Sequence, residues 1–333
     1  MSLSTFFRIF THMQLMPILE SGEETLVGGQ AVMEGVMMRA PHSYCVAVRK
    51  ASGEIVTEEM PLARMSEMYK IFRYPIFRGL GTLYQAMKLG GRALRFSANA
   101  ALDNPELQKP GKEARKEPRK EMPRWALAAP IAFSFVFFIF MYKFLPLWLV
   151  TQLSKVYPAL ENRVAFNATD GLIRLLILLA LLYSLSRTKD IRRVFAYHGA
   201  EHKVVFNFES GQTVNIENAQ RFSTFHPRCG TSFLFVVFVL AMPIYAVIPV
   251  DTFAAKLLIR IALIPVISGL AYELIRFAAK RQGSFMAWLT APGLWMQRIT
   301  TKPPSDEQTS IAIHALEGAM ALEKTQGGEL VIA

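Results

Sequence analysis

Half of the histidines in this chain, and one of its two cysteines, fall within residues 198–229. His198 and His202 are four residues apart, so on a helix they share a face and can direct both imidazoles at one ion. Glu201 lies beside that face, where it could act as a general base or orient a ligand. This H-x-x-E-H spacing is the inverted form of a zinc-protease motif. On its own it fits the polar side of a surface helix equally well.

His226 and Cys229 favour the metal interpretation. Imidazole and thiolate suit Zn²⁺ or a late transition metal, and Pro227 between them restricts the backbone as a short ligand loop requires. Three ligands would leave an open catalytic position, whereas four would close a structural site. The sequence therefore predicts a divalent metal, Zn²⁺ in first place, bound by a set drawn from His198, His202, His226 and Cys229.

Glu34 is a weaker candidate for a catalytic residue. It is the only acid in the apolar, glycine-rich run 27–39, where an ionised carboxylate is costly unless it is paired. It could complete the metal site, orient a ligand, or pair with Arg39 or a loop arginine, and an internal salt bridge is an equal alternative. The glycines of this run match neither G-x-G-x-x-G nor a Walker motif, so no nucleotide cofactor is expected.

The composition of the chain indicates a membrane protein whose soluble parts lie in a reducing compartment. With 52% hydrophobic and only 19% charged residues in 333, the chain is too apolar for an ordinary soluble domain. The net charge is +11, but the basic residues flank apolar runs, which favours a lipid bilayer as partner and argues against nucleic acid. Two cysteines in unrelated contexts predict no disulfide framework and a reducing compartment. No cleaved signal peptide is expected, because the first residues lack a cleavage-site pattern.

Four apolar runs are long enough to cross a bilayer as helices, which takes about 20 residues. They are 126–150, 171–185, 231–247 and 257–275. The second and fourth carry charges and could instead be buried or half-crossing helices. Lys and Arg number seven, two, seven, one and six in the successive segments that flank these runs. This alternation predicts a multi-pass membrane protein with both termini and the 186–230 loop in the cytoplasm.

The expected fold is therefore an α-helical integral membrane protein of about four transmembrane helices with a small N-terminal α+β region at the cytoplasmic membrane surface. Alternation around a glycine turn predicts a β-hairpin from strands 44–48 and 54–58. Residues 64–102 have a helical pattern that Pro75 and four glycines should break into a hairpin of surface helices. A tail helix is expected at 311–322. The predicted parts are 1–24 (N-terminal extension), 25–102 (β-hairpin and amphipathic helices), 103–124 (charged linker), 125–282 (membrane domain with the metal-site loop 186–230) and 283–333 (tail).

Four stretches carry a family resemblance: 28–39 (GGQAVMEGVMMR), 197–203 (YHGAEHK), 226–233 (HPRCGTSF) and 291–298 (APGLWMQR). Together they resemble the YqhQ-like bacterial membrane proteins, a family of unknown function whose members are sometimes labelled predicted metal-dependent enzymes. The resemblance extends over about 27–322. It implies a multi-spanning protein of the bacterial inner membrane with a metal site, and no substrate comes with it.

Two functions from different classes follow from these residues. The first is a metal-dependent hydrolase acting on a membrane-associated substrate, with Glu201 as acid and base, because activating water is the simplest use of such a site. The alternative is a non-catalytic scaffold or accessory protein in which the metal is structural. Transport is less favoured, because the apolar runs are poor in paired charges and no inverted repeat is evident. The substrate and the oligomeric state stay open.

Overall fold

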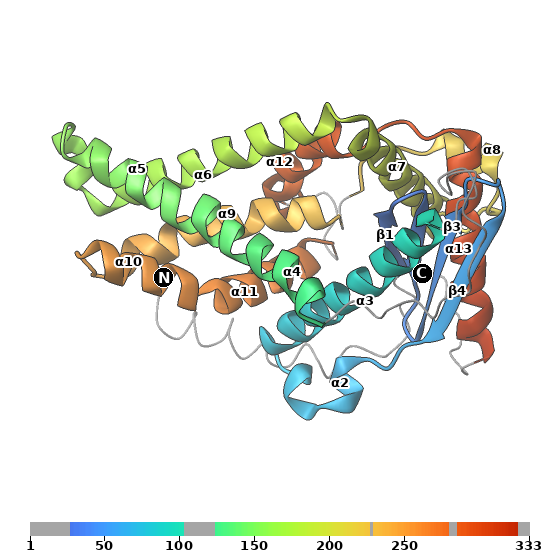
Figure 1. Cartoon of the computed structure of the whole chain (residues 1–333). Helices are drawn as coiled ribbons and strands as arrows, with labels where there is room; N and C mark the ends of the chain where they lie inside the picture. The colour runs from blue at the N-terminus through green and yellow to red at the C-terminus, as the bar shows by residue number, and fades with distance from the viewer. Residues whose placement is uncertain (1–26, 103–123, 227–228, 280–284, 326–333) are drawn as a thin grey trace.

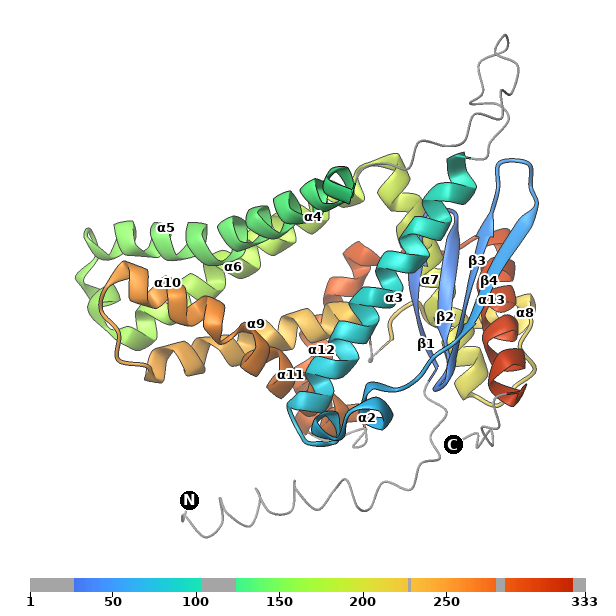
Figure 2. The same ribbon diagram turned by 60° about the horizontal axis from the view of Figure 1, so that its bottom comes forward.

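The computed structural model describes residues 27–102, 124–226, 229–279 and 285–325. The predicted extension 1–24 and nearly all of the predicted linker 103–124 lie outside the described residues. The described chain has two neighbouring parts, a small antiparallel sheet flanked by helices and a bundle of long apolar helices (Figure 1, Figure 2). The prediction of a mostly α-helical chain with a small N-terminal α+β region is confirmed.

The sheet is a meander of four antiparallel strands in the order β1-β2-β3-β4. They are β1 (Gly28–Val32), β2 (Gly35–Arg39), β3 (Ser43–Arg49) and β4 (Ile55–Pro61). The predicted hairpin is confirmed as β3–β4, in which Arg49 pairs with Ile55 and Gly53 has a φ of 88° in the turn. The glycine-rich run forms a second hairpin, β1–β2, whose turn holds Glu34 at a φ of 54°.

Helices cover both faces of the sheet. One face packs on α7 (Lys189–Glu209) and α13 (Asp306–Thr325), and Met38 belongs to the apolar core on that side. The opposite face packs on α3 (Phe77–Leu102), and Met37 belongs to the core there. Successive residues of a strand thus serve opposite faces, as its pleat requires, and the central strands read as continuous apolar runs. The predicted tail helix is confirmed as α13, which is part of the sheet's core.

Helix α3 differs from the sequence prediction. The expected helical hairpin over 64–102 is not formed, because α3 runs without interruption through all four glycines. At Gly90, an added β-carbon would lie 2.5 Å from the Gln30 amide oxygen of β1. Gly79, Gly81 and Gly90 therefore let neighbours approach closely, and none of the four glycines ends the helix. The chain between the sheet and α3 contains two short turns, α2 (Met65–Met68) and η1 (Lys70–Arg73).

The bundle contains the apolar runs. Ala132–Ser154, Arg163–Ser186 and Gly230–Val247 are each long and apolar enough to cross a membrane. Phe253–Ala262 and Ile264–Phe277 pass the same test together and are bent by 47°, which brings the number of candidate spans up to four. The helices are α4 (Arg124–Ile139), the π-helix η3 (Phe140–Phe144), α5 (Leu145–Ser154), α6 (Arg163–Ser186), α9 (Gly230–Val247), α10 (Phe253–Ala262), α11 (Ile264–Ala279) and α12 (Phe285–Thr300), with the short η4 (Pro158–Glu161) between α5 and α6.

One expectation about these runs is wrong. They were predicted to be poor in paired charges, yet Asp170 and Arg174 of α6 form a buried ion pair, and Arg260 of α10 donates to Asp170 at 2.6 Å. The pairing escapes the sequence pattern for two reasons. Asp170 lies just before the run 171–185, and its partner Arg260 follows 90 residues later.

Candidate metal centre

Helix α7 carries the two histidines and is held in the interior of the protein. His202 is 2% exposed, and Tyr197, Ala200 and Val204 on the same helix belong to the core beside the sheet. Gly199 faces the backbone carbonyl of Lys302 so closely that no β-carbon would fit between them. The i and i+4 spacing on this helix brings the two imidazoles together, with ring centroids 4.4 Å apart.

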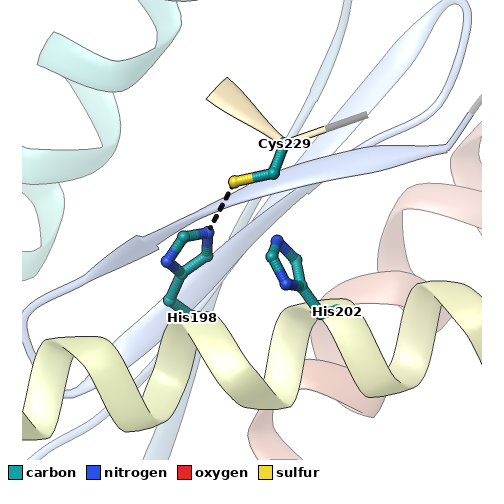
Figure 3. Close-up of side chains that lie close together, drawn as sticks. All are labelled: His198, His202 and Cys229. Atoms are coloured by element: carbon teal, nitrogen blue, oxygen red, sulfur yellow. Dashed lines mark hydrogen bonds between the residues drawn. The ribbon is translucent and has the colours of Figure 1, made fainter. Parts of the chain in front are cut away.

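Three ligand atoms converge above α7, one each from His198, His202 and Cys229 (Figure 3). All three lie within 4.8 Å of one another, and the Cys229 Sγ is 3.3 Å from the His198 Nε2. Around a tetrahedral zinc ion with bonds of about 2.0–2.3 Å, neighbouring ligand atoms lie about 3.3–3.6 Å apart. The cluster therefore needs only a small contraction to hold such an ion.

Backbone carbonyls orient both imidazoles. The Nδ1 of His198 lies 2.9 Å from the Thr300 oxygen, and the Nδ1 of His202 lies 2.5 Å from the Thr224 oxygen. A carbonyl oxygen can only accept, so each Nδ1 carries the proton and each Nε2 presents a lone pair to the cluster. Metal-binding histidines typically have this second hydrogen bond, which fixes the tautomer and the ring orientation.

The cysteine comes from a turn that α12 holds in place. The Gln297 side chain accepts from the His226 backbone N–H and donates to the carbonyl of the same residue, both at 2.8 Å. Cys229 then precedes the first residue of α9, and the Thr231 hydroxyl donates to its sulfur at 3.3 Å. The positive end of the α9 dipole favours negative charge at this sulfur. Gln297 is fully buried, and its two hydrogen bonds fix the backbone of the turn that leads to Cys229.

Glu201 lies beside the cluster. Its Oε2 is 3.9 Å from the His198 Nε2 and 3.8 Å from the His202 Nε2. Strand β1 covers this carboxylate, because an added β-carbon at Gly29 would be 2.8 Å from the Glu201 Cγ. The glycine in the first motif thus allows the sheet to close over the site, which is a packing role and not phosphate binding.

His226 lies next to these residues without joining the converging ligand atoms. Its ring centroid is 5.6 Å from that of His202, and its Nε2 is 3.5 Å from a Glu209 carboxylate oxygen. Burial lowers the pKa of His226, the Glu201 charge opposes this shift, and His198 adds to it. Together with the cluster, His226 lines a cavity of about 140 Å³.

Glu34 lies outside the residues that line this cavity. Its carboxylate accepts two hydrogen bonds from Arg193 of α7, at 2.7 and 2.5 Å, and its Oε2 lies 3.4 Å from the Tyr197 hydroxyl. Burial and the nearby Glu34 charge raise the pKa of Tyr197 to about 12, so this hydroxyl stays protonated. The sequence left Arg39, a loop arginine and the metal site as possible partners of Glu34. The structure pairs it with the loop arginine, Arg193.

Sequence reasoning missed the residues that support the cluster. Thr224 and Thr300 act through backbone carbonyls, which every residue possesses, so their identity carries no signal. Gln297 is different, because it lies within the motif 291–298. A glutamine in a largely apolar motif is a usable signal, because an amide that becomes buried must find hydrogen-bond partners.

The fold and the cluster define a class of protein with an apolar helical bundle and a His-His-Cys cluster next to a small antiparallel sheet. The family model described as "Protein of unknown function (DUF1385)" matches residues 74–322. The chain is 35% identical over 298 residues to the "Uncharacterized protein YqhQ" of Bacillus subtilis (strain 168), covering 89% of this chain and 92% of that protein. The chain belongs to this YqhQ-like family, and the resemblance inferred from its motifs is confirmed. No solved structure matches it significantly.

Proposed function

We propose that this protein is a multi-pass protein of the bacterial inner membrane and a zinc-dependent hydrolase at its cytoplasmic face. Large apolar side chains point outward from the bundle, as lipid contact would require: Phe133 is 72% exposed, Leu258 67% and Leu172 53%. The alternation of Lys and Arg between the apolar runs supports a cytoplasmic position for the sheet, α7 and both termini.

The observation that carries the hydrolase proposal is the position of Glu201 beside three converging ligand atoms. His198, His202 and Cys229 supply the three protein ligands that are typical of a catalytic zinc site, which keeps one position open. A bound Zn²⁺ would polarise a substrate carbonyl or phosphoryl group and lower the pKa of a water molecule. Glu201, about 4 Å from both Nε2 atoms, is placed to take the proton of the attacking water.

The shape of the site restricts what can react there. A cavity of about 140 Å³ is smaller than the roughly 300–1,000 Å³ of pockets that enclose a drug-sized ligand. It admits the reacting group of a substrate and leaves the remainder outside. Because Cys229 lies at the start of the apolar helix α9, the cavity is next to the end of a proposed span. A substrate anchored in or at the bilayer fits this position.

The metal prediction is tested on purified full-length protein by elemental analysis. We expect about one zinc per chain. His198→Ala or Cys229→Ser should weaken zinc binding by more than the roughly 10–100-fold that loss of a supporting hydrogen bond costs. His314→Ala is the matched control, because His314 is exposed on α13 and, within the described part of the chain, its ring bonds to the Ser310 carbonyl of its own helix. Equal zinc content in all four proteins, or none in the wild type, would contradict the proposal.

Glu201→Gln separates catalysis from a structural role. If Glu201 is the general base, the variant keeps its zinc and its fold but does not complement a deletion strain. A specific observation supports the scaffold alternative, because a carboxylate oxygen 3.8–3.9 Å from both imidazoles could also close the site as a fourth ligand. In that case Glu201→Gln loses zinc together with function. A variant that retains zinc and complements fully would remove Glu201 from either role.

A further inference from the structure

A second group of charged residues lies inside the apolar bundle, away from the sheet and the metal centre. Arg174 and Asp170 of α6 are 2% and 1% exposed, and Arg260 of α10 is 2% exposed. Asp170 pairs with both guanidinium groups, and Arg260 also donates to the Asn167 side chain at 2.9 Å. Two buried cations thus share one carboxylate.

A third cation joins them around the ring of Tyr245. Lys143 donates to the Tyr245 hydroxyl at 3.2 Å, and that hydroxyl donates to the backbone carbonyl of Arg260 at 3.3 Å. The charged groups of Lys143, Arg174 and Arg260 lie 5.7, 5.3 and 5.2 Å from the centre of this ring. Among the described residues, two guanidinium groups and the Lys143 amine surround one carboxylate, so positive charge is in excess. Such an excess is costly in a low-dielectric interior unless an anion compensates it.

The cluster has both an unused donor and access from outside. The Nε of Arg174 is buried and has no hydrogen-bond partner among the described residues. Arg260, Asn167 and Tyr245 line a cavity of about 170 Å³, which is an order of magnitude more than the roughly 10–15 Å³ that one water needs. The cavity reaches the loops that join α5 to α6 and α9 to α10, at the end of the bundle away from the sheet (Figure 2).

The backbone is irregular at two of the three cations. Lys143 lies in the π-helix η3, and Arg260 lies three residues before the 47° break between α10 and α11. Single π-turns are frequent at functional sites, and broken helices build the ligand sites of many membrane proteins. At the cavity rim, by contrast, the acids Glu161 and Asp251 balance the bases Arg163 and Lys256. The charge excess is therefore confined to the interior.

We propose that this cluster and its cavity bind a phosphomonoester group, supplied either by an anionic lipid headgroup or by free phosphate. A phosphate monoester carries a charge of about −1.5 to −2 at neutral pH, so it offsets more of the interior excess than the single charge of a carboxylate or a lipid phosphodiester. Guanidinium groups also match phosphate oxygens with paired hydrogen bonds. On the topology proposed above, this site opens on the side of the membrane opposite to the metal centre.

Binding to the purified full-length protein in non-ionic detergent tests the proposal. The probes are radiolabelled inorganic phosphate and phosphatidate in mixed micelles, with phosphatidylglycerol as the diester comparison. We expect saturable binding of inorganic phosphate or phosphatidate, at least tenfold tighter than of phosphatidylglycerol, and the probe that binds identifies the source. Arg260→Gln should weaken this binding at least tenfold. Arg187→Gln, exposed at the other end of α6 and outside the residues that line the cavity, should change it less than twofold.

Asp170→Asn keeps the test decisive if Arg260→Gln does not fold. This change removes the carboxylate that competes for the guanidinium groups, so affinity for the phosphate probe should rise, and a misfolded protein cannot show such a gain. Retained metal content reports separately that the sheet and α7 are intact. The proposal is overturned if neither phosphate probe binds saturably, or if Arg260→Gln and Arg187→Gln bind alike.

Discussion

The two acids that the motifs contain, Glu34 and Glu201, differ sharply in their surroundings. The Glu201 side chain is 9% exposed and lies between the imidazole nitrogens, whereas the Glu34 side chain is 34% exposed and pairs with an arginine that is itself 61% exposed. An exposed ion pair contributes only about 0–1 kcal/mol to stability, because water and salt screen it. Glu34 therefore anchors the β1–β2 turn to α7, and we expect it to take no part in the proposed reaction.

Glu34→Gln should accordingly leave zinc content and complementation unchanged and lower the free energy of unfolding by no more than about 1 kcal/mol. Elemental analysis and denaturant unfolding measure the two quantities. Arg193→Ala is the companion variant, since it removes the same pair from the other side. If Glu34→Gln loses zinc, Glu34 contributes to the metal site and this prediction is wrong.

At the scale of the elements, the C-terminal helix is part of the sheet's core. Helix α13 packs on β2 and β3, and Gly318 is the point of closest approach, where an added β-carbon would lie 2.7 Å from the Cys45 sulfur. The sheet and α7 flank the candidate metal centre, so the fit of α13 supports this site indirectly. A side chain at this glycine must push the helix away from the sheet.

Gly318→Ala should therefore lower the free energy of unfolding by about 1–3 kcal/mol, the usual cost of overpacking. Gly91→Ala is the matched control, because Gly91 is exposed on α3 with no atom near the added β-carbon. In the helix interior that change should be neutral or stabilising by up to about 1 kcal/mol. Thermal or denaturant unfolding measures both changes in the free energy of unfolding. Equal changes in the two variants would argue against the close packing of α13 on the sheet.

At the scale of the whole molecule, the two candidate sites lie at opposite ends of the bundle. The cavity of the charged cluster is bordered by the α5–α6 and α9–α10 loops, while the metal centre lies where α9 begins, beside the sheet (Figure 1). On the proposed topology, a bilayer separates them. The protein would then face an anionic ligand on one side of the membrane and a metal-dependent reaction on the other.

Substituted cysteines test this topology. Val156→Cys, in the exposed α5–α6 loop, should react with a membrane-impermeant maleimide in intact cells, whereas Lys324→Cys, exposed on α13, should react only after permeabilisation. The native thiols give little background because both are buried. Burial also raises the pKa of Cys45 to about 12, which suppresses the reactive thiolate. Labelling of both variants in intact cells would contradict the proposed arrangement.

The sequence by itself determined the features that depend on neighbouring residues. The apolar runs, the β3–β4 hairpin, the tail helix and the shared face of His198 and His202 all follow from hydrophobic period, turn residues or helical spacing, which act within one element. The family motifs could be recognised for the same reason, because each is a continuous stretch of chain.

Only the tertiary structure decided which distant groups meet. The Cys229 sulfur, and not the His226 ring, converges with the two imidazoles, and this depends on how Gln297 of α12 holds the turn. The tautomer of each histidine depends on backbone carbonyls that any residue could offer. Three of the four glycines of α3, which were expected to break the helix, are points of close contact with other elements. The pairing of Asp170 with Arg260 spans 90 residues and has no local pattern. In each case the physical cause is packing between elements, which places side chains according to shape and charge and not according to their separation along the chain.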